Sequence, residues 1–154
     1  MSLLELKQAV VMEPGNAPAR YALAEALFGE KAFRDARVQL EKTLTLDPNH
    51  ANARRLLGRV FEALEQPSEA HKVLTHPNTY ADLSDLHRRT TRPDDALLYA
   101  DMSARNSPAD PALWATCAQD LEHQGYFYRA LWAYGRALQL SGGDSVHAEA
   151  IERI

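Results

Sequence analysis

Apolar residues recur at intervals of three and four along most of the chain, which is the period of an amphipathic α-helix. The pattern is clearest over 111–140, where Gly125 separates two apolar stripes. These stripes predict a helix over 111–124 and a second over 126–140, joined by a turn so short that the helices must run antiparallel. The first stripe contains Leu113, Trp114, Cys117, Ala118 and Leu121, and the second contains Phe127, Ala130, Leu131, Tyr134, Ala137 and Leu138.

The pattern of this helix pair repeats along the chain. Ala36 and Ala70 are 34 residues apart, as are Ala96 and Ala130, whereas Ala70 and Ala96 are separated by only 26. A helix pair of this kind cannot bury its apolar faces alone and needs a neighbour on each side. We therefore expect an all-α solenoid with about four repeats and a half-repeat helix at each end. The repeats are expected at about 17–50, 51–76, 77–110 and 111–144, and the single helices at 2–12 and 145–154.

The second repeat is expected to be eight residues short. We assign the loss to its second helix, because His76 precedes Pro77 and a residue before proline is driven out of the α region. The shortening is either a kink that reshapes a binding groove or a tolerated deletion. Thr79 and Asp82 have the spacing of a capping pair for the next helix.

Side chains on the inner stripes should form the core, and small residues should mark the points where helices cross closely. The residues expected to be buried are Leu23, Leu27, Ala36, Leu40, Leu57, Phe61, Ala70, Leu83, Ala96, Trp114, Leu121, Ala130 and Tyr134.

The series Trp114, Cys117, Ala118, Leu121, Ala130 and Tyr134 resembles the tetratricopeptide repeat. Three positions differ from that family's pattern, because Cys117 stands in place of Leu, Ala118 in place of Gly and Gly142 in place of Pro. The resemblance implies one domain over 1–154, a right-handed solenoid of antiparallel helix pairs whose first helices line a concave groove for peptides. The Lys, Asn and Arg clamp that some members use for a C-terminal carboxylate has no counterpart at the matching positions.

Charge and composition limit the classes of protein to which the chain can belong. The net charge is −4 and no run of Lys or Arg occurs, so we expect no binding to nucleic acid. The single cysteine excludes an intramolecular disulfide, and no stretch reaches the roughly 18 apolar residues of a membrane span. We expect a cytoplasmic protein that does not enter a membrane.

No catalytic motif, phosphate-binding loop or metal-binding His pair stands out, so we predict no enzyme activity, no cofactor and no metal site. His71, His76 and His87 flank the short repeat but lack a carboxylate or thiol placed with them. Cys117 lies on an apolar stripe and is expected to be an inert buried thiol.

One polar pattern suggests a binding site for a protein or peptide partner. Arg55 and Arg59 are four residues apart on a first helix, and Arg88 and Arg89 end the next one. Tyr21, Glu25, Gln119 and His123 lie on the neighbouring first helices. We expect these eight residues to face a partner segment, with the arginines favouring an acidic one and Asp85 and Glu122 at the rims. The alternative is a solvated face of mixed ion pairs.

A second function class is a scaffold or assembly segment. Leu3, Leu6 and Val10 at one end and Ile151 and Ile154 at the other would form apolar patches that favour a weak homodimer. The aromatic residues Tyr126, Tyr128 and Trp132 either form an outer contact surface or pack against the terminal helix.

Overall fold

The computed structural model describes residues 1–90 and 92–154. Within these residues it contains α-helices and a single 3₁₀ turn but no strand, so the all-α class is confirmed. The chain folds into two compact units, Met1–Thr75 and His76–Ile154. The single domain expected over 1–154 stays a prediction.

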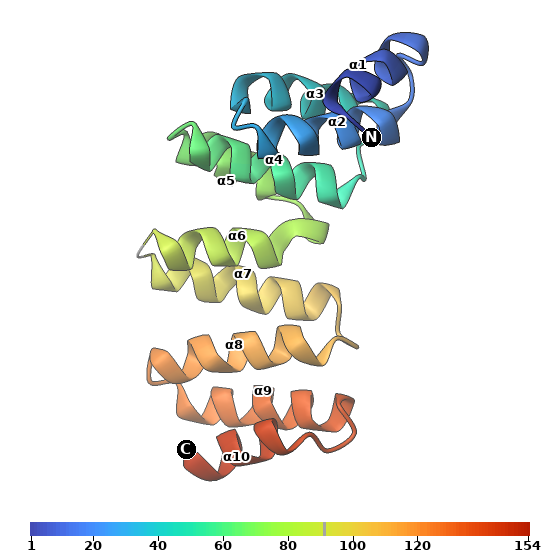
Figure 1. Cartoon of the computed structure of the whole chain (residues 1–154). Coiled ribbons are helices and arrows are strands. Elements are labelled where there is room, and N and C mark those ends of the chain that lie inside the picture. The colour runs from blue at the N-terminus through green and yellow to red at the C-terminus, as the bar shows by residue number, and fades with distance from the viewer. Residues whose placement is uncertain (91) are drawn as a thin grey trace. The chain divides into compact units, whose positions relative to one another are not determined.

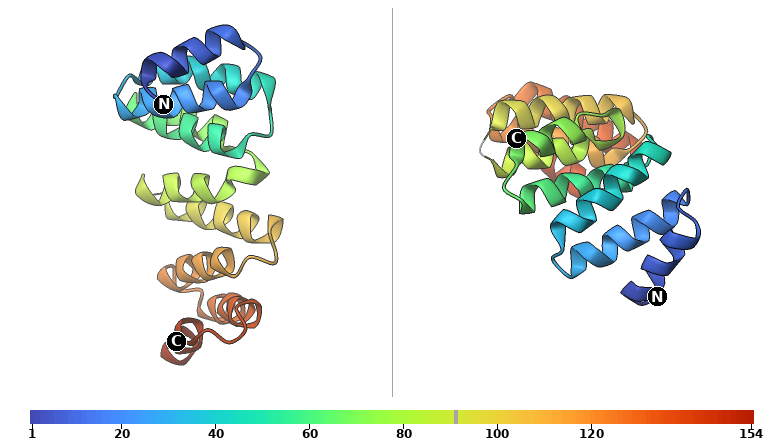
Figure 2. Two further views of the ribbon diagram at one scale, coloured as in Figure 1. Left: turned by 45° about the vertical axis from the view of Figure 1, so that its right-hand side comes forward. Right: turned by 90° about the horizontal axis from the view of Figure 1, so that it is seen from above.

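Each unit is a stack of helices in which every helix packs antiparallel against the next (Figure 1). The first unit contains α1 (Leu3–Met12), α2 (Ala17–Gly29), α3 (Phe33–Leu46), α4 (Ala51–Ala63) and α5 (Pro67–Leu74). The second contains the 3₁₀ turn η1 (Pro77–Thr79), α6 (Tyr80–Arg89), α7 (Pro93–Asn106), α8 (Pro111–His123), α9 (Phe127–Leu140) and α10 (Ser145–Arg153). Figure 2 shows the same stacking from two other directions. The pairs α2/α3, α4/α5, α6/α7 and α8/α9 fall within the four predicted repeats.

Small residues stand where the two helices of each pair cross. Every first helix has one at its centre (Ala24, Gly58, Ser84, Ala118), and twelve residues later every second helix has an alanine (Ala36, Ala70, Ala96, Ala130), and all eight are buried. A Cβ atom at Gly58 would lie only 2.9 Å from the Leu74 side chain. The Ser84 hydroxyl fits because it donates to the Ala96 carbonyl at 2.8 Å. Close helix packing therefore fixes residue size at these positions.

The turns between repeats use the same contacts three times. A long side chain in the first turn of the helix donates to the carbonyl of the proline six residues before it. Arg20 Nε contacts Pro14 O at 2.7 Å, Trp114 Nε1 contacts Pro108 O at 3.0 Å, and Arg54 Nη2 contacts Pro48 O. Asn16, His50 and Asp110 cap the helices that follow these turns. These bonds satisfy backbone groups that a helix end leaves unpaired.

The shortening affects the second helix of the short repeat and also the first helix of the next repeat. α5 has 8 residues where α3 has 14, which confirms the predicted shortening of the second helix. However, α6 has 10 residues where α4 has 13, so assigning the whole loss to α5 was wrong. The predicted capping pair was also wrong. Thr79 makes no side-chain cap to α6, and its hydroxyl donates to the His76 carbonyl at 3.3 Å because η1 occupies the start of the helix.

All thirteen residues expected in the core are buried. Phe127 was wrongly placed on the inner stripe and is 54% exposed, because it is the first residue of α9 and precedes the part of the helix that α8 covers. The residues named for apolar patches at the two ends are mostly covered, although α1 exposes other apolar side chains, Leu4, Val11 and Met12. Leu6 and Val10 are buried in the first unit, and Ile151 and Ile154 pack against the core of the second. The homodimer stays a prediction.

Candidate partner-binding surface

In the first unit, α2 and α4 present a shared polar surface. Tyr21 on α2 is half-buried, its ring lies 4.8 Å from the His50 ring, and its hydroxyl donates to Glu25 at 2.8 Å. Burial raises the pKa of Tyr21 to about 12, and the Glu25 carboxylate adds to the effect. The positive charges of Arg55 and Arg59 act in the opposite direction on the same pKa, which places both near the Tyr21 hydroxyl.

Both arginines of α4 make contacts within the first unit. Arg55 is exposed, and its Nη1 donates to the Asn52 side chain at 3.2 Å. Arg59 is exposed, and its guanidinium lies over the Phe28 ring at 4.9 Å. A guanidinium stacked on a ring keeps its N–H edge open toward solvent, where it can pair with a carboxylate. Leu56, Leu57, Val60 and Phe61 occupy the buried side of α4, as predicted.

In the second unit, Arg88 is neutralised by two carboxylates. Arg88 on α6 makes two bonds to Asp120 on α8, Nε to Oδ1 at 3.1 Å and Nη2 to Oδ2 at 2.7 Å, and a third to Asp85 at 2.5 Å. Hydrogen bonding to Asp120 raises the pKa of Arg88. Two carboxylates already compensate this charge, which weakens the attraction of Arg88 for an outside anion.

The other predicted residues of this unit are dispersed. Arg89, Gln119 and His123 are exposed, and His123 Nδ1 lies 2.7 Å from the Gln119 carbonyl within its own helix. Glu122, which was expected at the rim of a groove, links α8 to α9 and α10. It accepts bonds from Tyr134 at 2.9 Å and from Arg153 of α10 at 2.8 Å, and the Arg153 contact lowers its pKa.

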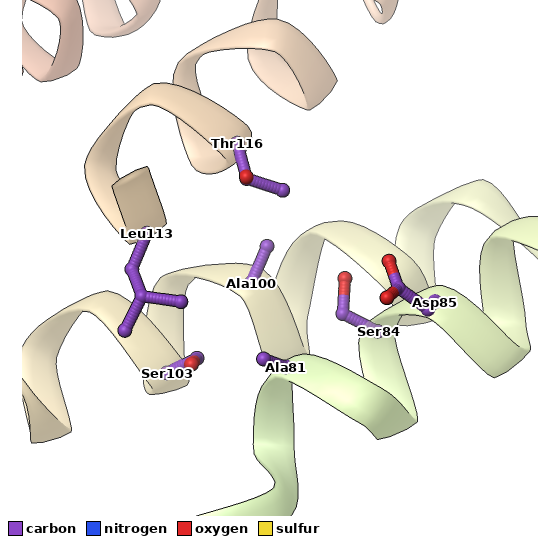
Figure 3. A pocket seen from close by; sticks show the side chains of 7 residues that line it. All are labelled: Ala81, Ser84, Asp85, Ala100, Ser103, Leu113 and Thr116. Atoms are coloured by element: carbon purple, nitrogen blue, oxygen red, sulfur yellow. The ribbon is translucent and has the colours of Figure 1, made fainter. Parts of the chain in front are cut away.

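A hollow of about 70 Å³ lies between α6, α7 and α8. Figure 3 shows the side chains around it, all of them short except Asp85 and Leu113: Ala81, Ser84, Asp85, Ala100, Ser103, Leu113 and Thr116. The hollow exists because small residues occupy the helix crossings on each side. It is large enough for a methyl-sized group or one or two waters but not for a metabolite.

The two other residues considered for reactivity or metal binding, Cys117 and His87, are both buried. Cys117 is buried, and burial raises the pKa of its thiol to about 11, which keeps it protonated and unreactive near neutral pH. His87 is buried, and its ring stacks on the Tyr99 ring with centroids 5.4 Å apart. Among residues 1–90 and 92–154, no group of three or more His, Cys, Asp or Glu is placed to hold a metal ion.

The aromatic residues around α9 face outward. Tyr128 is 91% exposed, Trp132 61% and Tyr126 49%, so the idea that they pack against the terminal helix was wrong. Trp132 instead meets Trp114 of α8 edge to face, with ring centroids 5.3 Å apart.

Three residues at these surfaces were not anticipated from the sequence. Phe28 was detectable, because it lies seven residues after Tyr21 and therefore on the same face of α2. His50 and Asp120 gave no such signal. Arg55 and Arg59 belong to the first unit, and Arg88 and Arg89 belong to the second. That all four arginines face one partner segment therefore stays a prediction.

No helix in the described part of the chain has the length and apolar character needed to cross a membrane. No curated protein sequence matches the chain. Residues 27–88, however, match a family model described as tetratricopeptide repeat.

Solved structures share the fold. The crystal structure of MamA aligns with a TM-score of 0.68 and 18% identity, over 91% of this chain and 86% of that one. PilF of Pseudomonas aeruginosa aligns with a TM-score of 0.67 and 21% identity, over 94% and 69%. YrrB, described as a TPR protein with an unusual peptide-binding site, aligns with a TM-score of 0.61 and 16% identity, over 97% and 81%. Residues 27–88 thus match the tetratricopeptide repeat, and the chain has a fold similar to that of these solved structures.

Proposed function

We propose that the chain is a non-catalytic protein–protein interaction module that binds an acidic segment of a partner protein on the α2/α4 surface. The observation that carries the proposal is the pair of exposed guanidinium groups, Arg55 and Arg59, beside the Tyr21 hydroxyl. The fold supports the general class, because tetratricopeptide repeats generally serve protein interaction and YrrB, which has this fold, is described with a peptide-binding site.

An acidic segment suits the surface for two reasons. Arginine pairs with a carboxylate through two parallel N–H bonds, which gives direction as well as charge attraction. The Glu25 carboxylate of α2 is already a hydrogen-bond acceptor for Tyr21 at 2.8 Å. Glu25 should also weaken binding of long polyanions through local repulsion.

The affinity should be modest and dependent on salt. Arg55 and Arg59 are exposed, and charges in that position are screened over about 8 Å at physiological ionic strength. Raising the salt concentration should therefore slow association and weaken the complex.

The test is a titration of the full chain into a fluorescein-labelled peptide with four glutamates spaced among leucine and alanine. A second peptide carries four lysines in place of the glutamates. The acidic peptide should bind and the basic one should not. The double change Arg55→Glu with Arg59→Glu should weaken binding by about tenfold or more, since hot-spot arginines typically contribute that much.

A matched control is available on α3, where Arg34 and Lys42 are both exposed. The double change Arg34→Glu with Lys42→Glu alters the net charge by the same amount and should leave affinity nearly unchanged. Equal loss in both double variants would mean that net charge alone attracts the peptide. Undiminished binding after Arg55→Glu with Arg59→Glu would contradict the proposed site.

The alternative is a scaffold or assembly segment that uses the outer side of the helices. The exposed aromatic residues around α9 favour it, since large apolar side chains left in solvent commonly mark contact surfaces. A weak homodimer would belong to this alternative. Light scattering over a hundredfold range of concentration would contradict the dimer if it returned only the monomer mass.

A further inference from the structure

α9 differs from every other α-helix in the described chain because it contains no Asp or Glu. This is notable in a protein with 21 acidic and 17 basic residues. α9 carries Arg129 and Arg136, and in the described structure neither forms an ion pair. Its exposed side is therefore aromatic and positive, and no carboxylate on the same helix offsets that charge.

An open hollow lies along this side between α8 and α9. It is lined by Trp114, Trp132, Gly135, Arg136 and Gln139. The two indole rings stand nearly perpendicular, at 82°, so that the exposed Trp132 forms a wall beside the buried Trp114. The arrangement gives a ligand a flat apolar face to pack against and a polar edge beside it.

Gly135 gives independent evidence that the space is used. It sits in the interior of α9, where glycine destabilises a helix by roughly 1 kcal/mol relative to alanine. Neither its backbone nor its packing requires glycine. Its φ is not positive, and a Cβ atom built on it would meet nothing within 4 Å. A helical glycine with open space above it is expected where another backbone approaches closely.

The hydrogen-bonding groups around the hollow are mainly donors. Trp114 Nε1 is already committed to the Pro108 carbonyl, whereas Trp132 Nε1 donates to no group in the described residues. Gln139 Oε1 accepts from Arg136 at 2.9 Å, which leaves the Gln139 amide N–H groups and the other Arg136 N–H groups pointing to solvent. A matching ligand must supply acceptors and apolar surface but few donors.

A proline-rich segment has this chemistry. Proline has no N–H, its ring is compact and apolar, and in a polyproline II helix every backbone carbonyl is free to accept. Such segments dock in aromatic-lined grooves because little conformational entropy is lost on binding. We infer that the α8/α9 hollow binds a proline-rich segment of a partner protein, with an acidic residue beside Arg136. This site is separate from the α2/α4 surface and shares no residue with it.

The test uses the full chain and a fluorescein-labelled peptide of six prolines flanked on both sides by glutamates, followed by anisotropy. One comparison peptide has alanines in place of the prolines, and another has lysine flanks. The proline peptide with glutamate flanks should bind most tightly. Its binding should also shift the emission of the exposed Trp132 toward the blue, as the indole leaves water.

Three variants distinguish binding in the hollow from nonspecific binding to exposed aromatic residues. Trp132→Ala should reduce affinity by about tenfold or more. Gly135→Leu should fill the hollow and reduce affinity without lowering the melting temperature, since nothing lies within 4 Å of its Cβ position. Tyr128→Ala is the matched control, because Tyr128 is an exposed aromatic residue on the same helix that does not line the hollow, and it should change affinity less than twofold.

Several results would overturn the inference. These are no binding of the proline peptide up to millimolar concentration, equal binding of the alanine peptide, or an equal loss in Tyr128→Ala and Trp132→Ala. Binding of a labelled oligothymidine in preference to the peptide would assign the aromatic and basic surface to single-stranded nucleic acid instead.

Discussion

The exposed faces of α4 and α6 occupy the same place in successive repeats, yet their arginines are in different electrostatic states. On α4, Arg55 donates to the Asn52 side chain and Arg59 lies over the Phe28 ring. On α6, Arg88 is bound by Asp85 and Asp120, so its charge is largely compensated within the unit. Counting arginines along a repeat protein therefore overestimates its positive surface, since the neighbouring helix decides how much of each charge reaches a ligand.

The cores of the two units, in contrast, are built alike, and overpacking them should have the largest effect on stability. Ala36 of α3 and Ala130 of α9 are both fully buried at helix crossings. Changing either to Leu should lower the free energy of unfolding by about 1–3 kcal/mol, measured by chemical denaturation. Ala112→Leu, at an exposed position of α8, is the control and should have little effect. If only one of the two substitutions lowered the free energy of unfolding, the two cores would not be packed alike.

The next effect tests what neutralises Arg88. Asp120→Asn should lower the free energy of unfolding by about 1 kcal/mol, because its side chain is only 12% exposed and makes both bonds to the guanidinium. Asp85→Asn should cost less, because Asp85 is 53% exposed and makes one contact. The Asp120 variant should bind the glutamate peptide as tightly as the wild type, because Arg88 is not part of the proposed α2/α4 surface. Tighter binding would contradict a site limited to that surface.

Two turns lie at equivalent places in the two units. Substitutions in them should change the melting temperature by a smaller amount, and in opposite directions. Lys31, after α2, has φ of 61°, and Gly125, after α8, has φ of 80°. The left-handed region is unfavourable for a side chain by about 1–2 kcal/mol and free of cost for glycine. Lys31→Gly should therefore raise the melting temperature and Gly125→Ala should lower it. Changes of the same sign would show that contacts outside the backbone dominate these turns.

The smallest effect is a pH dependence confined to the second unit. Hydrogen bonds from Arg153 hold the pKa of Glu122 below its ordinary value of 4.5. The unfolded state therefore takes up a proton first as pH falls. This contribution is present above about pH 5 and is lost as pH drops through the lowered folded-state pKa. Glu122→Gln and Arg153→Gln should both flatten the fall in melting temperature with acid. Arg136→Gln, where the arginine has no carboxylate partner in the described chain, should leave that slope unchanged.

The sequence by itself determined the helices, the repeat spacing and the core. Helical periodicity depends on residues three and four apart. The burial of Leu23, Leu57 and Leu121 could therefore be predicted directly from their spacing. The buried small residues, such as Ala24 and Ala36, followed from the same period, because a close helix crossing leaves no room for a larger side chain. The exposure of Arg55 and Arg59 opposite a buried stripe on α4 was also readable from local spacing.

Only the tertiary structure decided which charges meet. Arg88 and Asp120 are 32 residues apart, and Glu122 and Arg153 are 31 apart, so no local pattern connects them. The burial of Leu6 and Val10 and the exposure of Trp132 likewise depend on where a neighbouring helix ends. The physical reason is that helix formation and apolar burial follow from short-range period. The pairing of long flexible side chains instead depends on the offset between packed helices and on the rotamers at their contact, which only the assembled fold defines.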